Sequence, residues 1–348
     1  MEQIIRQFRL QSPLASCEPL GQGHINASYR VQTLHGPDYL LQRISTEAFH
    51  DVPALMRNIA QVTAFLARQA ENPGHALRLI PTLDGRSYYA APDGQYYRMY
   101  NYIENTLCLE EAQQPRDLYA CAYAFGSFLK GLSAFPAASL CETIPRFHNT
   151  PARYEALKAA IAGDAAGRAA SCREEIAFAL SREQDAPSLT EQLARGLLPL
   201  RVTHNDTKLS NVLLDKGTRK PVCVVDLDTV MPGLAAYDFG DLVRTGAGTG
   251  AEDERDLSKV TFSMERYALL QSGFLDACGD VLTDGEIRSL PLGGRLMTLE
   301  CGVRFLTDYL SGDRYFRISR PEHNLDRCRT QFRLVRCMES CWAELTGG

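Results

Sequence analysis

Several features are missing from this sequence, and each absence excludes a class of protein. No run of eighteen apolar residues occurs, and residues 1–8 lack the apolar core of a signal peptide, so we expect a cytoplasmic protein without a membrane segment. The net charge of −5 argues against nucleic acid or an anionic membrane as a partner. The sequence also contains no feature that indicates an obligate protein partner.

The eleven cysteines lack the spacing of a metal or redox site. Their number is odd, no Cys-x-x-Cys motif occurs, and Cys337 and Cys341 lie four residues apart in a helical pattern. Disulfide frameworks are typical of secreted proteins with evenly paired cysteines. We therefore expect free thiols in a reducing compartment.

What the sequence does contain is a polar octet, residues 204–211, between two apolar runs. This pattern predicts a loop between two buried segments, and rigidly held loops often carry catalytic residues. A further apolar run, 222–225, ends at Asp226. A hairpin at Lys216-Gly217 would bring Asp226 back beside Asn211.

These residue types match phosphoryl transfer. Asp206 would accept the proton of the attacking hydroxyl, and Lys208 would lie near the γ-phosphate of ATP, while Asn211 and Asp226 would hold Mg²⁺. A single aspartate in a loop is more often a turn residue or a helix cap. The spacing His-x-Asp-x-Lys-x-x-Asn, however, is that of the protein-kinase catalytic loop, and it resembles the aminoglycoside and choline phosphotransferase superfamily. We therefore predict a kinase that uses ATP and Mg²⁺.

Two further aspartates lie near this loop. Asp228 follows Asp226 on the same face of an extended strand, where it is either a second metal ligand or a hydrogen-bonding support. Asp238 opens a helix, and it either caps that helix or holds the backbone N–H groups of the catalytic loop. We interpret Asp238 as structural.

The N-terminal part predicts an antiparallel β lobe. Gly21 and Gly23 indicate a hairpin turn, which is either an ordinary turn or a loop whose N–H groups cover phosphate oxygens. Alternating apolar residues between Asp-Gly turns predict a five-stranded meander with one helix, with later strands at 39–44, 80–82, 87–90 and 96–103 and the helix at 52–68. The residues expected to bind the nucleotide are Gly21, Gly23, Asn26, Arg43 and Tyr102.

The usual phosphate-binding cation is missing from this lobe. Gln42 stands where the superfamily carries a basic residue, and Arg43 should point to the opposite face of the strand. Either a register shift presents Arg43 or another group supplies the charge. The helix at 52–68 also lacks a glutamate facing the strand, so we expect the lysine–glutamate pair of protein kinases to be absent.

The rest of the chain is predicted to be mostly helical. Helices are expected at 116–135, 153–161, 173–180, 189–198, 257–272 and 292–310, with a last helix from Pro321 and a capping box at 283–286. The predicted fold class is therefore α+β, a bilobal protein-kinase-like fold. A small antiparallel β lobe with one helix, residues 1–103, binds the nucleotide, and a larger, mostly helical lobe, residues 104–348, is catalytic. On the long helix, Glu300, Arg304 and Asp308 share one face, which by itself indicates a solvated salt-bridge ladder.

With these residues in place, the chain closely resembles the N-acetylhexosamine 1-kinases, a sugar-kinase branch of the superfamily. The resemblance covers most of the chain and includes Gly-x-Gly-His-Ile-Asn at 21–26, Leu-Met-Arg-Asn at 55–58, Arg-Val-Thr-His-Asn-Asp-Thr-Lys-Leu at 201–209, Asp-Leu-Asp-Thr at 226–229, Met-Pro-Gly at 231–233, Asp-Phe-Gly-Asp at 238–241, Glu-Cys-Gly at 300–302, Arg-Phe-Leu at 304–306 and Pro-Glu-His-Asn-Leu at 321–325.

The resemblance implies phosphorylation of the anomeric hydroxyl of N-acetylglucosamine or N-acetylgalactosamine. It also implies that His24, Arg304 and Tyr315 bind the sugar alongside Asp206, which would make Arg304 a sugar ligand. Thr245 stands where close family members would carry an aromatic residue over the sugar, and this departure argues against a narrow sugar preference.

Two other functions stay open on the sequence alone. The acceptor could be an aminoglycoside or another amino alcohol, although such cations generally need an acidic pocket. The protein could also be a pseudokinase or a nucleotide-dependent binding module, as Gln42 and the missing helix glutamate suggest.

Overall fold

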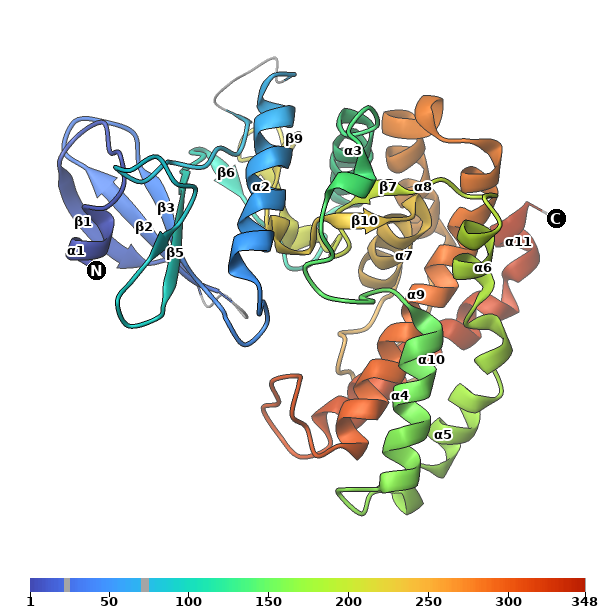
Figure 1. The fold of residues 1–348 in the computed structure, drawn as a ribbon. Helices are drawn as coiled ribbons and strands as arrows, with labels where there is room; N and C mark the ends of the chain where they lie inside the picture. Colours follow the sequence, from blue (N-terminus) through green and yellow to red (C-terminus); the bar gives the residue numbers. More distant parts are fainter. Residues whose placement is uncertain (22–25, 70–74, 348) are drawn as a thin grey trace.

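The computed structural model describes residues 1–21, 26–69 and 75–347, and it has a sheet-rich N-terminal part and a larger helical part (Figure 1). This arrangement confirms the predicted α+β kinase-like class. The lobe boundary after residue 103 stays a prediction. Across the described ranges, no helix has the length and hydropathy needed to cross a bilayer. All eleven cysteines lie in these ranges, and they are free thiols, as predicted.

The N-terminal part contains a five-stranded antiparallel sheet in the order β1-β2-β3-β5-β4. After the short helix α1 (Glu2–Ile5), its strands are β1 (Leu14–Pro19), β2 (Ala27–Thr33), β3 (Tyr39–Ile44), β4 (Tyr89–Ala90) and β5 (Tyr96–Asn101). The predicted strand at 80–82 is wrong. That segment forms only isolated bridges, since Pro81 has no N–H to donate to a ladder. The order also departs from a simple meander, because β5 lies between β3 and β4.

The two faces of β3 contact different cores. Tyr39 and Leu41 pack with α1 residues such as Ile5 in an outer cluster. Leu40 and Ile44, at alternate positions, belong to the large cluster that continues into the helical part. Side chains at even positions of β3 therefore point toward the catalytic residues.

Helix α2 (Val52–Ala67) lies between the sheet and the helical part (Figure 1). Asp51 caps it by accepting a hydrogen bond from Ala54 N–H (2.9 Å). On its buried face, Asn58 donates to Val230 O (3.1 Å), close to the predicted metal site. Helix α2 is therefore joined to the helical part by a common hydrophobic core and by a buried hydrogen bond.

The helical part combines nine helices in the described ranges with two small sheets. The helices are α3 (Pro115–Gly131), α4 (Thr150–Gly163), α5 (Arg173–Leu180), α6 (Ser188–Ala194), α7 (Ala235–Gly246), α8 (Met264–Cys278), α9 (Asp284–Leu310), α10 (His323–Ser340) and α11 (Trp342–Thr346). One sheet has the order β6-β8-β9, and in the other β7 pairs with β10; the strands are β6 (Thr106–Leu107), β7 (Arg201–Thr203), β8 (Val212–Asp215), β9 (Pro221–Val224) and β10 (Met231–Gly233). The catalytic octet therefore connects the two sheets, between β7 and β8.

Helix α9 begins earlier than predicted. The capping box is confirmed, because Glu286 N–H donates to Thr283 Oγ1 (3.2 Å) and Thr283 N–H donates to Glu286 Oε2 (2.8 Å). It opens α9 itself, and the helix continues through Pro291. The predicted helix began after this proline, whose ring removes an N–H donor from a helix interior. Packing against α7 and α10 overrides that local preference.

Helices α7 and α9 approach closely where two glycines meet. A Cβ on Gly240 would collide with the backbone of Gly293, and a Cβ on Gly293 would collide with the carbonyl group of Ala236. Glycine at these positions therefore lets the two backbones touch. Because α7 carries Asp238 and Asp241, this contact also positions residues next to the catalytic loop.

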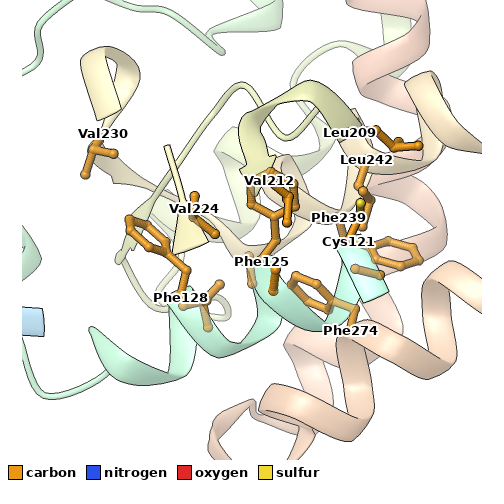
Figure 2. Packing of buried hydrophobic residues seen from close by; sticks show 14 of the residues in the cluster. Cys121, Phe125, Phe128, Leu209, Val212, Val224, Val230, Phe239, Leu242 and Phe274 are labelled. Carbon is orange, nitrogen blue, oxygen red and sulfur yellow. The ribbon is translucent and has the colours of Figure 1, made fainter. Parts of the chain in front are cut away.

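A hydrophobic core supports that loop (Figure 2). Phe125 and Phe128 of α3 belong to the same cluster as Val212 and Val224, which lie on the strands beside the loop. Both phenylalanine rings lie edge-on to the ring of His204, with centroids 5.3 and 5.8 Å away. The start of the octet is thus packed as firmly as the interior of the domain.

Candidate active site

Carboxylates of α7 hold the predicted catalytic loop in place. Asp238 accepts hydrogen bonds from the backbone N–H groups of His204 (2.9 Å) and Asn205 (2.7 Å), and Asp241 accepts one from Thr207 N–H (2.9 Å). The φ angle of Asn205 is +65°, a conformation that is costly for a residue other than glycine, so the loop depends on these bonds. The structural role predicted for Asp238 is confirmed, whereas the sequence prediction missed Asp241.

The burial of Asp238 has a consequence for stability. Burial raises the pKa of this carboxyl to about 6, although His204 and the two backbone N–H groups oppose the shift. In the unfolded chain the ordinary value is 3.8, so the folded state binds the proton more tightly. This stabilising contribution is fully present below about pH 4 and is lost as the pH rises through about 6.

We therefore expect the pH dependence of stability to differ between the native protein and Asp238→Asn. From about pH 5 to about pH 7, the free energy of unfolding of the native protein should fall by about 1 kcal/mol relative to the variant. Chemical denaturation at the two pH values measures this difference. The same pH dependence in both proteins would contradict the raised pKa.

His204 connects the loop to the segment that carries Asp226. Its Nε2 donates to Val225 O (3.0 Å), and its Nδ1 accepts from Asp206 N–H (3.3 Å). These partners assign the neutral ring with the hydrogen on Nε2. One imidazole therefore holds the backbone next to both predicted catalytic carboxylates.

Asp206 lies at the centre of a cluster of polar side chains. Asn211 Nδ2 donates to its Oδ2 (2.9 Å) and to its backbone oxygen (2.8 Å), and Lys208 Nζ lies 3.1 Å from the same Oδ2. Burial opposes ionisation, but the charge of Lys208, with the hydrogen bonds from Lys208 and Asn211, outweighs it and lowers the pKa of Asp206 below its ordinary value. The carboxylate is thus ionised at neutral pH, and its side chain stays 29% exposed to a reacting molecule.

Asp226 reaches this cluster from the end of β9. Val225 N–H donates to Asn211 O (2.9 Å), which places Asp226 beside the octet. Desolvation, followed by repulsion from Asp228 and Asp206, raises the pKa of Asp226 to about 7, while the residue keeps an exposed surface. The structure therefore brings the predicted base and both predicted metal ligands together.

These donors fit a magnesium ion that is shared with a nucleotide. In residues 1–21, 26–69 and 75–347, no group of three His, Cys, Asp or Glu side chains forms a metal site of its own. Mg²⁺, however, is usually held by only one or two carboxylates and completed by phosphate oxygens and water. The crowded carboxylate of Asp226 and the side-chain oxygen of Asn211 suit that arrangement, since a cation would relieve the repulsion around Asp226.

Asp228 is buried and is held by residues of the N-terminal part. It is 3% exposed, forms an ion pair with Arg98 of β5, and accepts a hydrogen bond from Asn26 Nδ2 (2.6 Å). Of its two possible roles, the structure favours hydrogen-bonding support over metal ligation. The sequence prediction missed Arg98, and the available signal was a charged residue inside the apolar run of β5.

The predicted glycine turn is only partly described. Gly21 has a φ angle of +67°, which suits a glycine in a tight turn, whereas Gly23 and His24 lie outside the described residues. The Oδ1 of Asn26 accepts from Ser45 N–H (3.0 Å), so both ends of this amide are used within the protein. Nucleotide contacts from Gly21, Gly23 and Asn26 stay predictions.

The other two predicted nucleotide contacts lie on the sheet. Arg43 is exposed, its charge acts on the pKa of Tyr97, and the ladder between β3 and β5 runs without a register shift. The structure therefore places Arg43 on the face opposite Gln42 and does not bring it to the Asp226 cluster. Tyr102 follows β5, and the Arg30 guanidinium lies 4.5 Å from the centre of its ring. Adenine binding by Tyr102 stays a prediction.

The face of α9 formed by Glu300, Arg304 and Asp308 is not a solvated salt-bridge ladder. Glu300 is buried and accepts from His148 Nδ1 (2.9 Å). Asp308 accepts from the backbone N–H groups of residues 314–316 at 2.8 to 2.9 Å, and so shapes the loop that carries Tyr315. Each carboxylate thus organises a neighbouring segment, and the simple spacing argument was wrong for this face.

His148 links α9 to the catalytic loop. Its Nε2 donates to Asn205 O (3.3 Å), while its Nδ1 donates to Glu300. Burial favours the neutral acid, but the bonds from His148 and Thr150 outweigh it and lower the pKa of Glu300. The sequence prediction missed His148, which lies in a loop with no motif of its own.

Arg304 and Tyr315, two of the predicted sugar ligands, lie together. The Arg304 guanidinium is 5.2 Å from the ring centre of Phe147, 5.7 Å from that of Tyr315 and 5.4 Å from that of Phe316. Tyr315 is 66% exposed, so its ring is available to another molecule. Since Phe147 precedes His148, this aromatic group adjoins the catalytic loop.

Comparison with known proteins places this geometry in a family. Residues 16–270 match the phosphotransferase enzyme family. The chain is similar to a solved aminoglycoside phosphotransferase from Alicyclobacillus acidocaldarius subsp. acidocaldarius, with 14% identity, a TM-score of 0.62, and coverage of 100% of this chain and 97% of that one. It is also similar to a microcompartment-associated aminopropanol kinase, with 15% identity, a TM-score of 0.60, and coverage of 99% and 97%.

A third similar structure is a spectinomycin phosphotransferase in complex with ADP and spectinomycin, with 12% identity, a TM-score of 0.60, and coverage of 92% and 93% of the two chains. At such identities these likenesses show the fold alone. The family match, in contrast, spans most of the chain and includes the whole catalytic cluster. This protein belongs to the phosphotransferase enzyme family.

Proposed function

We propose that this protein is an ATP-dependent kinase that phosphorylates the anomeric hydroxyl of N-acetylglucosamine or N-acetylgalactosamine to give the sugar 1-phosphate. Family membership supports the phosphotransferase chemistry. The observation that carries the proposal is the convergence of Asp206, Asn211 and Asp226 in one cluster. The motifs shared with N-acetylhexosamine 1-kinases, together with the acceptor side described below, support the choice of sugar.

Each residue of the cluster has a role in the proposed reaction. Asp206, ionised and partly exposed, takes the proton of the sugar hydroxyl as the hydroxyl attacks the γ-phosphorus. Lys208 offsets the negative charge of the γ-phosphate, and Asn211 orients Asp206 through its Nδ2. Asn211 and Asp226 would hold Mg²⁺, which when bound neutralises charge on the β- and γ-phosphates.

The charges on the acceptor side favour a neutral sugar over a cationic acceptor. Arg304 forms no ion pair with any residue of the described ranges, and the carboxylates of Glu300 and Asp308 are already hydrogen-bonded. Burial, and then the charge of Arg304, lowers the pKa of Arg153, so two guanidinium groups share this region. An aminoglycoside or amino alcohol would be repelled there, whereas sugar hydroxyl and acetamido oxygens accept hydrogen bonds from a guanidinium.

Replacing Arg304 tests this assignment. Arg304→Met removes a charged hydrogen-bond donor worth about 1.5 to 3 kcal/mol, so the KM for the N-acetylhexosamine should rise by about 10- to 100-fold. The KM for ATP should change little, because Arg304 lies on the acceptor side. Arg317→Met, an exposed position on the loop that carries Tyr315, is the matched control and should leave both values unchanged. An unchanged sugar KM in Arg304→Met would remove this residue from the acceptor site.

ADP release with a panel of acceptors tests the function itself. We expect release that depends on N-acetylglucosamine or N-acetylgalactosamine. Release that depends instead on an aminoglycoside or an amino alcohol would select the alternative acceptor. Release without any acceptor dependence, or none at all across pH and Mg²⁺ concentration, would indicate a pseudokinase or a nucleotide-binding module.

A further inference from the structure

The cationic side chain of Arg98 lies next to Gln42, the position at which a basic residue is missing. Gln42 of β3 stands where a basic residue is expected, and its direct partner across the β3–β5 ladder is Arg98. Side chains directly opposite each other in an antiparallel pair lie on the same face of the sheet. The side chains also touch, because Arg98 Nε donates to Gln42 Oε1 (2.9 Å). Arg98 therefore presents its charge on the face where Gln42 presents none.

The guanidinium of Arg98 joins the sheet to the segment that follows Asp226. Arg98 is 1% exposed, and its Nη1 pairs with Asp228 Oδ1. The other oxygen, Asp228 Oδ2, accepts from Asn26 Nδ2 (2.6 Å). Both carboxylate oxygens of Asp228 are thus held by residues of the N-terminal sheet region.

The segment that follows Asp226 is also hydrogen-bonded to the catalytic loop, through Thr229. Thr229 Oγ1 donates to His204 O (2.7 Å), and Asn205 Nδ2 donates to Thr229 O (2.9 Å). Asp226 lies between the hydrogen bonds of Thr229 and the end of strand β9. A displacement of Asp228 would therefore displace Asp226, because only Leu227 separates them.

We infer that Arg98 is a positioning residue for the magnesium–nucleotide site: from β5 it holds Asp228, and through Asp228 the metal-binding Asp226, in place of the lysine–glutamate pair that this chain lacks. The inference rests on the nucleotide-binding part of the proposed function and not on the identity of the acceptor. It also assigns Asp228 to support, since both of its oxygens are already held by Arg98 and Asn26.

Two other roles for Arg98 make different predictions. If the ion pair only stabilises the fold, removing Arg98 lowers the melting temperature and leaves nucleotide affinity unchanged. If Asp228 is itself a metal ligand, its ion pair with Arg98 competes with Mg²⁺. Removing Arg98 then makes Asp228 available to the metal, and the magnesium-dependent affinity for ADP stays the same or increases. The proposed positioning role alone predicts a loss of magnesium-dependent affinity in the folded protein.

The test is the Kd for ADP, measured by calorimetry with and without Mg²⁺ below the melting temperature of every variant. In Arg98→Met, the factor by which Mg²⁺ tightens ADP binding should fall by about 10- to 100-fold, as for other residues that support metal ligands. Arg98→Lys should show a smaller loss, since it keeps the charge but loses the Nε contact to Gln42. Arg182→Met is the control: it removes an ion pair in the helical part in which Arg182 donates two hydrogen bonds to Glu339. It should lower the stability of the protein and leave the effect of Mg²⁺ on ADP binding unchanged.

An Arg98→Met protein that melts earlier but keeps the native magnesium effect within about twofold would overturn the inference, since outer-shell residues typically matter more than that. Should Arg98→Met fail to fold, Arg98→Lys decides: a magnesium effect reduced by more than about twofold supports the inference, and an effect within about twofold of the native one overturns it. Because ADP binding needs no acceptor, a native protein that binds ADP with Mg²⁺ but does not phosphorylate N-acetylhexosamines would refute only the acceptor assignment. A native protein that does not bind ADP would refute both.

Discussion

Asp206→Asn is expected to lower kcat by about 10²- to 10⁴-fold, the contribution of a general base in the transition state. Asparagine keeps the size of the side chain but cannot accept the hydroxyl proton. Because the Asp206 side chain is partly exposed and, among the described residues, is bonded to Lys208 and Asn211, the free energy of unfolding should change little. Steady-state ADP release gives kcat, and ADP affinity shows whether the nucleotide site is intact.

A second aspartate on a nearby turn serves as the control for this variant. Asp215, at the end of β8, accepts from Thr218 N–H (2.7 Å) and lies on the exposed turn before β9. Asp215→Asn should weaken that turn slightly and leave kcat unchanged. If Asp206→Asn turned over at the native rate, Asp206 would not be the base and the proposed mechanism would fail.

Gly293→Ala is expected to destabilise the fold where α7 and α9 meet. Its Cβ would collide with the carbonyl group of Ala236, and neither backbone can move without separating α7 from α9. Overpacking costs about 1 to 3 kcal/mol and sometimes more, and alanine regains about 1 kcal/mol of helix propensity, so we expect a net loss of about 2 kcal/mol. Since α7 carries Asp238 and Asp241, kcat should fall as well.

The adjacent glycine provides a matched comparison. A Cβ on Gly294 would meet Val243 Cγ1 at 3.1 Å, and a valine side chain can shift by a few tenths of an ångström. Gly294→Ala gains the same helix propensity without a backbone collision, so it should be close to neutral. Urea denaturation of both variants measures the difference. Equal stabilities would show that the α7–α9 contact tolerates a methyl group.

The catalytic cluster could be predicted because its members are close in sequence. Asp206 and Asn211 lie in one loop, and a short hairpin returns the chain to Asp226, so local spacing was sufficient. Asp238 could also be interpreted from its place at the start of a helix. In each case, a polar residue next to an apolar run indicated both the position and the role.

The missed contacts join residues that are far apart in the sequence. Arg98 and Asp228 are separated by 130 residues, and His148 and Glu300 by 152. Hydrophobic periodicity predicts which residues of an element are buried, but it does not predict which element will face them. A charge inside an apolar strand, such as Arg98, does indicate a buried partner, because an unpaired charge would be too costly there.

Some errors in the predicted elements have the same origin. The predicted helix began at residue 292, yet α9 starts earlier and runs through Pro291, since packing on both sides of the helix outweighs one lost hydrogen bond. The segment at 80–82 has the composition of a strand but contains Pro81 and forms single bridges. Local preference is thus a guide that tertiary contacts can override in either direction.

The most direct test of the central claim is the position of the new phosphate. N-acetylglucosamine labelled with ¹³C at C1 is incubated with ATP, Mg²⁺ and the protein, and the product is observed by carbon and phosphorus NMR. A reaction in which Asp206 activates the anomeric hydroxyl predicts coupling between the labelled carbon and phosphorus. A product whose phosphate shows no coupling to C1, because it is attached to another hydroxyl of the sugar, would contradict the proposed function.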